Sequence, residues 1–389
     1  MTFTAEQLEI RALARDFAQT EIAPHAEAWD AAGKIPDDLF LRMAELGFLG
    51  MLVPERYGGL DLDVATYLLV LEEIARADAS VALTVAIHSG PVPGILLAHG
   101  SESQKEGWLP RLASGEIIGA FALTEPGAGS DAAAIACVAR RAGAGWALDG
   151  EKSWVTNGAR AGLVMTFART SPEGVGCFLA EPSQEGYHIV RSVTTMGHRA
   201  SETVDVALRG LEVGDESLIG DPQRAFTYAL EGLVLGRAGI AAQALGIAQA
   251  SLDHATRYSL EREQFGRPLS DFGATQAKLA NMAARISAVR STIQEVGRRL
   301  DRERRGDRDT GTGADALVAR AAGAKLLASE TAMYAADEAV QIFGGYGYMR
   351  DYPVERLMRD AKGTEIFEGT SEIMRVVIAR EIIKAAREA

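Results

Sequence analysis

The sequence predicts a mostly α-helical protein with a central β domain. Three observations predict this class: apolar residues recur at helical spacing near the start of the chain, short β-type runs separated by turns fill the middle, and long alanine-rich helical stretches follow. With 389 residues, 47% of them hydrophobic, the chain can bury large cores and should divide into two or three domains. We place the domains at residues 1–118, 119–222 and 223–389.

The N-terminal domain is expected to be helical. Apolar side chains follow helical intervals from Leu8 to about Leu49, with Pro36 separating two sets. Two further helices are predicted over residues 64–77 and 81–98. The second should be bent or broken around Pro91 and Pro93, because proline lacks a backbone donor and clashes with the preceding turn.

The middle domain carries the β structure, from about Ile117 to Ile219. Runs such as Leu163–Phe167 and Cys177–Leu179 are short, apolar and bounded by turn residues. Such runs indicate strands rather than helices, which need longer periodic segments.

The C-terminal domain is expected to be a bundle of four long helices, over residues 226–260, 274–300, 316–343 and 371–386. The first of these contains four glycines, Gly232, Gly236, Gly239 and Gly246. Each costs about 1 kcal/mol of helix stability relative to alanine, so a close approach of another helix or of a ligand should compensate.

Composition narrows the function. Lys and Arg number 40 against 53 Asp and Glu, and the net charge of −13 argues against a nucleic acid or an anionic membrane as the main partner. The segment Met1–Glu6 lacks the features of a secretory signal, and we find no uninterrupted apolar run long enough to cross a bilayer. We therefore expect a cytoplasmic protein. Cys137 and Cys177 have no His or Cys neighbours at metal-ligand spacing, so we predict two inert buried thiols and no metal site.

The segment Phe121–Asp131 is the first motif that could form part of a binding site. A β-type stretch containing Phe121, Leu123 and Thr124 runs into a turn of small residues that includes Gly129 and Ser130. Free backbone amides in such a turn can cradle a phosphate or the edge of a ring. The segment fits neither the dinucleotide fingerprint nor a Walker loop, and an ordinary tight loop explains it equally well.

A second motif is Lys152–Gly158, an alternating strand before an Asn-Gly turn. Alternation places Trp154 and Thr156 on one face and Val155 on the other. A flat aromatic ring and a hydroxyl would then share a surface. Core packing of Trp154 is the alternative.

Two further motifs end helices. In the first, Arg262 and Arg267 flank Phe265 and could bind a diphosphate by paired N–H donation. In the second, Gln341 and Ile342 precede Gly344 and Gly345. Helix C-capping is the alternative explanation of both.

Glu368 precedes Gly369 in the segment Thr364–Arg375, just before an amphipathic helix that Thr370 or Ser371 would cap. Glu368 therefore lies off the helix, near its start, where a catalytic base could sit. A surface carboxylate favoured by the helix dipole is the alternative.

Taken together and in this order, these segments resemble the acyl-CoA dehydrogenase family over nearly the entire chain. Val53–Gly59 and Gly107–Pro110 are also similar to the family pattern. The resemblance implies an N-terminal helical domain, a middle β-barrel-like domain and a C-terminal four-helix bundle. It also implies a homotetramer built as a dimer of dimers, with one FAD in each subunit.

The resemblance also implies roles for residues. The segment from Phe121 through Leu123, Thr124 and Gly129 to Ser130 looks like the flavin-contacting loop, with Thr124 near the ring and Ser130 shared with acyl-CoA. Further cofactor positions are Trp154, Val155, Thr156, Thr370 and Glu372. Similarity assigns contacts with the neighbouring subunit's FAD to Arg262, Phe265, Gln341, Ile342, Gly344 and Gly345. Substrate positions are Ser130, Val234, Arg237 and Gly369.

Family members place the base at one of two positions, which correspond here to Glu368 and Gly236. Only Glu368 is acidic. The resemblance therefore implies that Glu368 removes the α-proton of a saturated acyl-CoA while the β-hydrogen leaves as hydride to the flavin, and that electrons pass to an electron-transfer flavoprotein. Two residues depart from the family pattern, Val234 and Gly273. A flavin oxidase or monooxygenase on the same scaffold is the alternative they leave open. A non-catalytic flavoprotein would give no reason for the paired presence of Glu368 and Gly236.

Overall fold

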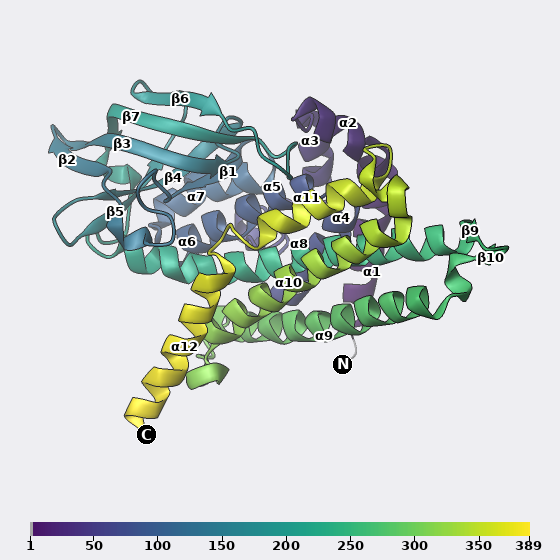
Figure 1. The fold of residues 1–389 in the computed structure, drawn as a ribbon. Helices are drawn as coiled ribbons and strands as arrows, with labels where there is room; N and C mark the ends of the chain where they lie inside the picture. Colours follow the sequence, from purple (N-terminus) through teal and green to yellow (C-terminus); the bar gives the residue numbers. More distant parts are fainter. Residues whose placement is uncertain (1–2) are drawn as a thin grey trace.

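A computed structural model describes residues 3–389. Figure 1 shows N-terminal helices, a twisted sheet at one end and a long helical bundle that extends away from the sheet. The predicted class, mostly α with a central β domain, is confirmed. We predicted that the segment Met1–Glu6 is not a secretory signal. Met1 and Thr2 of that segment lie outside the described residues.

The N-terminal part consists of short helices. Its members are α1 (Ala5–Phe17), α2 (Ala26–Ala32), α3 (Asp37–Glu45), α4 (Val64–Ala77), α5 (Ala79–Ser89), α6 (Pro91–His99) and α7 (Glu102–Ala113). Thr4 caps α1 with Gln7 in a reciprocal pair of hydrogen bonds, and Asp63 caps α4 through the Thr66 amide. The helix predicted over residues 81–98 is broken at Gly90, immediately before Pro91, as expected.

The sheet contains β1 (Ile118–Ala122), β2 (Val138–Ala142), β3 (Gly145–Thr156), β4 (Ala161–Arg169), β5 (Val175–Ala180), β6 (Tyr187–Ser192), β7 (Thr203–Gly214) and β8 (Leu218–Ile219). The spatial order is β6-β7-β3-β2-β4-β5-β8, and β1 pairs with β4 in parallel. β4 and β5 are buried along nearly their whole length, which explains their continuous apolar runs. Both cysteines are buried in this part of the chain, and burial raises the pKa of the Cys137 thiol to about 11.

The C-terminal part contains α8 (Ala225–Glu261), α9 (Gly273–Arg304), α10 (Leu317–Phe343), α11 (Pro353–Thr364) and α12 (Ser371–Glu388). The short strands β9 (Glu263–Gln264) and β10 (Arg267–Pro268) form a hairpin between α8 and α9. The four predicted long helices are present, and α11 is an additional one that the sequence analysis did not identify. The close approach predicted for the α8 glycines is confirmed at Gly246, where an added Cβ would lie 2.5 Å from the Glu72 carbonyl oxygen on α4.

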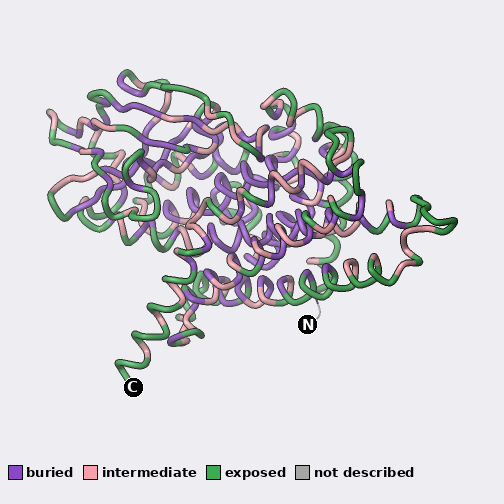
Figure 2. The backbone as a smooth tube through the Cα atoms, in the orientation of Figure 1, coloured by how far each residue is buried: buried purple, intermediate pink, exposed green. Residues whose placement is uncertain are grey.

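Figure 2 shows the buried residues concentrated where α4, α5, α8 and α10 meet. Two stretches, Ala79–His99 and Ala225–Glu261, are long and apolar enough to cross a membrane by length and composition. The prediction that no segment is long enough to cross a bilayer was therefore wrong. Within the structure 83% and 78% of their most apolar windows are buried. Their apolar character is therefore explained by packing inside the protein.

Candidate active site

Glu368 lies in the turn between α11 and α12. Its φ is 56°, and Gly369 follows at 97°, so the chain passes through two successive left-handed residues. Thr370 then caps α12 by accepting a hydrogen bond from the Ile373 amide at 3.3 Å. The turn directs the Glu368 side chain back toward α8.

The Glu368 carboxylate is buried, and the interpretation of Glu368 as a surface group is wrong. Its Oε2 atom has no hydrogen-bond partner within residues 3–389, although the residue as a whole keeps partial exposure. A Cβ added at Gly236 would lie 2.6 Å from Oε2. The absence of a side chain at Gly236 therefore leaves the space that the carboxylate enters.

Three groups surround this carboxylate electrostatically. Arg237 on α8 is 6% exposed, and its Nε has no partner among the described residues. Lys325 on α10 is fully buried, and so is Tyr67 on α4. Burial raises the pKa of Glu368 to about 7, and the positive charges of Arg237 and Lys325 oppose that rise. Burial is the larger effect, and it also raises the pKa of Tyr67, where the charge of Glu368 adds to it.

The loop that follows β1 is held by a buried ion pair. Lys152 on β3 donates to the Glu125 carboxylate at 2.7 Å and to the Leu123 carbonyl at 3.1 Å. Glu125 also accepts the amides of Ala136 and Cys137, at 2.5 and 3.0 Å. The Ser153 amide donates to the Thr124 carbonyl at 2.9 Å, which joins the loop to β3. The sequence analysis missed the Lys152–Glu125 pair, since nothing in the sequence relates the two residues.

Most residues at the tip of this loop are open to solvent. Gly129 and Ser130 are exposed, Phe121 and Thr124 are half-buried, and Leu123 is buried. The tip of the loop is therefore accessible from solvent, whereas Leu123 packs inside the protein.

Trp154 is 57% exposed, and the interpretation of Trp154 as a core residue is wrong. Its φ of 60° coincides with a shift of register between Lys152 and Val155 in the pairing of β3 with β7. Val155 is buried and Thr156 half-buried.

The two helix-end motifs lie together at the other end of the molecule, beside the β9–β10 hairpin (Figure 1). The Arg262 guanidinium lies over the Tyr346 ring at 5.5 Å. Phe265 is 95% exposed, Gln341, Gly344 and Gly345 are also exposed, and Ile342 is buried. A single chain does not bring this group to the loop after β1.

The remaining predicted residues lie near Glu368 in the chain or on α8. Thr370 is half-buried and Glu372 exposed at the start of α12. Val234 is half-buried on α8, and Gly273 is exposed at the start of α9 with open space around it.

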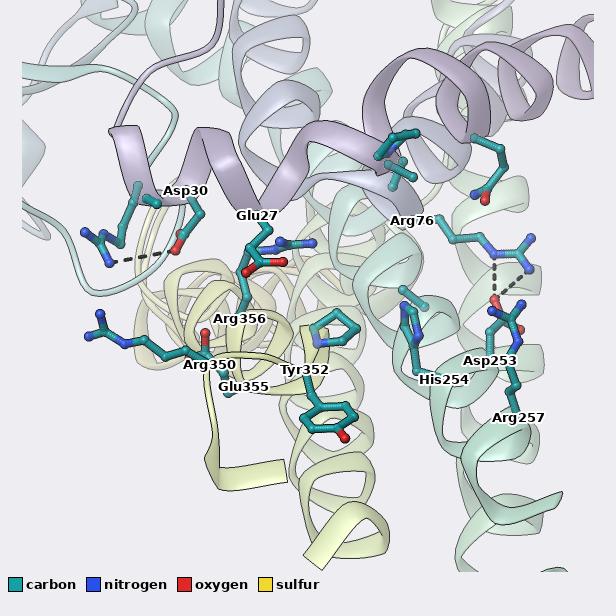
Figure 3. A pocket seen from close by; sticks show the side chains of 18 of the residues that line it. Glu27, Asp30, Arg76, Asp253, His254, Arg257, Arg350, Tyr352, Glu355 and Arg356 are labelled. Atoms are coloured by element: carbon teal, nitrogen blue, oxygen red, sulfur yellow. Dashed lines mark hydrogen bonds and ion pairs between the residues drawn. The ribbon is translucent and has the colours of Figure 1, made fainter. Parts of the chain in front are cut away.

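A cavity of about 690 Å³ lies elsewhere, between α1, α2, α8 and the start of α11 (Figure 3). Guanidinium and carboxylate groups alternate around it, and several are paired. Arg76 contacts Asp253 at 2.6 Å, and Arg359 binds both Asp30 and Glu355. No residue predicted for the site lines this cavity, which is a separate feature with six arginines and four carboxylates in its lining. Within residues 3–389 no group of three or more His, Cys, Asp or Glu could hold a metal ion.

Comparison with known proteins agrees with this arrangement along the whole chain. Family models match residues 4–116 (acyl-CoA dehydrogenase, N-terminal domain), 120–211 (middle domain) and 224–383 (C-terminal domain). The chain is 41% identical over 387 residues to an acyl-CoA dehydrogenase of Bacillus subtilis, covering 98% of this chain and 99% of the relative. It is 39% identical over 382 residues to the mitochondrial short-chain specific acyl-CoA dehydrogenase of Mus musculus, covering 97% and 90%.

Solved structures are similar over the same length. Butyryl-CoA dehydrogenase from Megasphaera elsdenii superposes with a TM-score of 0.94 at 36% identity, covering 98% of this chain and 99% of that one. A chain from structural work on the electron transferring flavoprotein of Acidaminococcus fermentans, aimed at a mechanism of flavin-based electron bifurcation, gives 0.93 at 38% identity, covering 99% of both chains. The prolyl acyl carrier protein oxidase AnaB gives 0.91 at 29% identity, covering 97% and 99%.

Proposed function

Because the chain belongs to the acyl-CoA dehydrogenase family, an oxidoreductase family, we propose that Glu368 is the base that removes the α-proton of an acyl-CoA thioester. The observation that carries this proposal is the Glu368 carboxylate beside Gly236, whose Oε2 atom is buried and has no hydrogen-bond partner among residues 3–389. An unpartnered buried acceptor is costly in a resting protein. It is useful when the proton that it accepts arrives with the substrate.

The pKa of Glu368 suits this task. A base is most effective when its pKa lies near the working pH, and burial brings that of Glu368 to about 7. The α-carbon of a thioester is a very weak acid, so a carboxylate with an ordinary pKa would be a poorer acceptor. Arg237 and Lys325 keep a fraction of the carboxylate ionised at neutral pH by opposing the effect of burial.

The positive charge of Arg237 would also stabilise the reacting substrate. Proton removal creates negative charge at the thioester oxygen, and an arginine already buried without a partner for its Nε is prepared for such charge. The similarity of this chain to short-chain and butyryl-CoA dehydrogenases favours a short acyl group.

FAD is the cofactor that we propose, and the residues present fit it. The exposed Trp154 indole offers a flat face, while Thr124, Thr156, Gly129 and Ser130 offer hydroxyl groups and accessible backbone around the same loop. When bound, FAD supplies the acceptor for the β-hydride. The buried Lys152–Glu125 pair fixes the loop before the cofactor binds.

The exposed group at the hairpin end supports an assembled enzyme. Phe265 is 95% exposed, although its ring lies edge-on to that of Phe272 at 6.2 Å, and an exposed large apolar side chain of this kind is typical of a binding surface. We propose that Arg262, Phe265, Gln341, Gly344 and Gly345 contact the FAD of a neighbouring subunit in a homotetramer. An electron-transfer flavoprotein is the proposed acceptor, supported by the similarity of this chain to one from structural work on an electron transferring flavoprotein.

A flavin oxidase is the second candidate. The open space at Gly273, the apolar Val234 and the similarity to an acyl carrier protein oxidase favour it. Reoxidation distinguishes the two functions: an oxidase, once reduced, returns to its yellow form in air within seconds in the presence of product, whereas a dehydrogenase stays bleached until an electron-transfer flavoprotein is added.

Replacement of the base tests the main proposal. Purified Glu368→Gln should remain yellow yet fail to bleach when butyryl-CoA is added anaerobically. Glu365→Gln is the matched control, because Glu365 lies in the same turn and its carboxylate accepts a hydrogen bond from Lys362 at 2.7 Å. Bleaching by Glu368→Gln at the unmodified rate would refute the assignment.

A further inference from the structure

Lys325 is an unusual residue for the middle of a helix-bundle core. It lies on α10 with none of its side chain exposed, and its Nζ donates a hydrogen bond to the Gly369 carbonyl oxygen at 2.7 Å. Buried ammonium groups are unfavourable unless they are paired. The acceptor that Lys325 uses is the backbone of the residue directly after the proposed base.

The turn that Lys325 contacts is one that needs support. Glu368 has a φ of 56°, which non-glycine residues rarely adopt unless the surroundings enforce it. Behind it, the Ser371 amide donates to the Glu365 carbonyl at 3.0 Å and closes the turn. Lys325 holds the Gly369 peptide from the bundle side. The two hydrogen bonds together fix the direction in which the Glu368 side chain leaves the backbone.

The charge of Lys325 acts on the same carboxylate. The charged and titratable groups that face this space are Arg237 on α8, Lys325 on α10, Tyr67 on α4, and Glu365 and Glu372 beside the turn. Burial lowers the pKa of Lys325 to about 8, an effect that the charge of Glu368 opposes, so the ammonium form predominates at pH 7. Its positive charge lowers the pKa of Glu368 against the effect of burial.

We propose that Lys325 is a positioning residue for the base: its ammonium group fixes the Glu368–Gly369 turn through the Gly369 carbonyl and favours the ionised carboxylate. The inference rests on the proposed function, since it assigns Lys325 a part in the same proton transfer. It extends that function because Lys325 need touch neither substrate nor cofactor.

Lys325→Met, which keeps length and removes the charge, is the principal test. The rate of flavin bleaching by butyryl-CoA should fall on the order of 10²-fold, as a misplacement of about 1 Å would cause, with KM little changed. The acid limb of the rate against pH should move to higher pH, because the carboxylate loses a stabilising cation. Lys278→Met is the matched control: it removes a lysine that pairs with Glu338 between α9 and α10, away from the turn, and should leave both readouts unchanged.

A second readout does not depend on turnover. Amide hydrogen exchange in the segment 365–374 should become faster in Lys325→Met and not in Lys278→Met, because the turn loses its support. If Lys325→Met does not fold, Lys325→Gln carries the test, since it keeps a donor and removes the charge; the acid limb must move in the same direction.

The outcomes separate this inference from the proposed function. An unmodified protein that does not bleach with acyl-CoA would refute the function itself. An unmodified protein that bleaches, with a Lys325→Met variant of equal rate, pH profile and exchange, would overturn only the role of Lys325.

Discussion

At the scale of single residues, Glu368 and Gly236 occupy one small space between them. The carboxylate reaches that space from the turn before α12, and the space exists because α8 carries no side chain at residue 236. A glycine in the middle of a helix costs about 1 kcal/mol relative to alanine. The placement of the base offers a functional reason for that cost.

Gly236→Ala should therefore damage catalysis without unfolding the protein. The added methyl would lie 2.6 Å from the Glu368 Oε2, so the carboxylate must move, and the rate of flavin reduction should fall at least about tenfold. Gly107→Ala is the control, because a Cβ there on α7 meets nothing within 4 Å. Stopped-flow bleaching with butyryl-CoA measures both, and equal rates would exclude steric coupling between residues 236 and 368.

The pKa of Glu368 also predicts a pH dependence of stability. Burial raises the pKa of Glu368 from its ordinary value of 4.5 to about 7, so the folded protein binds the proton more tightly than the unfolded chain does. Stability from this group is complete below about pH 4.5 and is lost as the pH rises to about 7. Glu368→Gln should consequently be more stable than the unmodified protein at pH 8, by up to about 3 kcal/mol, with a smaller gain at pH 5.

Denaturant unfolding of the two proteins at both pH values measures this difference. Asp78 and Asp360 are also buried with a raised pKa, near 7 and 6, and give a slope of the same sign in both proteins. Only the difference between the proteins reports on Glu368. A constant difference from pH 5 to pH 8 would contradict the raised pKa.

At the scale of elements, the loop after β1 depends on a strand that is distant in sequence. Lys152 on β3 donates hydrogen bonds to Glu125 and to the Leu123 carbonyl. Glu125 also accepts hydrogen bonds from the two amides that precede β2. One buried ion pair therefore connects three strands around the proposed flavin loop.

Lys152→Met should leave Glu125 buried without its cation, which typically costs 3–5 kcal/mol, and should lower the flavin content of the purified protein. Adding Glu125→Gln to the same chain should recover much of the stability, because the unpaired charge is then absent. Denaturant midpoints and the ratio of flavin to protein absorbance measure both effects. A Lys152→Met variant with unchanged stability would show that the pair does not hold the loop.

Elements differed in how far the sequence could predict them. The helix expected over residues 64–77 matches α4, because Asp63 supplies a cap and the apolar pattern is strong. α11 was missed, although Pro353 begins it and Val354, Leu357 and Ala361 share one buried face. α11 has only 12 residues, so its apolar pattern repeats over fewer turns than those of the long helices and is a weaker signal.

Some features of the candidate site could likewise be predicted from the sequence, and others could not. Alternation predicts a shared face for Trp154 and Thr156, but a register shift interrupts β3 at Trp154, and the exposure of the indole depends on whether another layer covers it. The burial of Glu368 and the partnership of Lys325 with Gly369 come from helix packing between distant segments, which a local pattern does not encode.

At the scale of the whole molecule, predicted cofactor residues lie at two separated ends (Figure 1). Thr124 and Trp154 belong to the sheet end, while Arg262 and Phe265 belong to the hairpin end. One subunit alone does not complete a site from both. The proposed assembly of identical subunits resolves this division.

Phe265→Ala should therefore weaken subunit association and FAD retention together, because the exposed ring is the most prominent apolar group at the hairpin end. Sedimentation velocity and flavin absorbance should both change. Val190→Ala is a matched control on β6, where the side chain is 58% exposed far from the hairpin. A Phe265→Ala tetramer with full FAD content would argue against the role proposed for the hairpin.

Helix α8 joins these two ends. Its 37 residues span about 55 Å at a rise of about 1.5 Å per residue. Gly236 and Arg237 lie in its first half, and Arg262 follows its last turn. A continuous helix moves as a rigid body. A tilt of α8 that opens the space around Glu368 therefore also displaces the β9–β10 hairpin. In an assembled enzyme, the position of α8 would then affect both substrate binding in its own subunit and FAD binding in the neighbouring subunit.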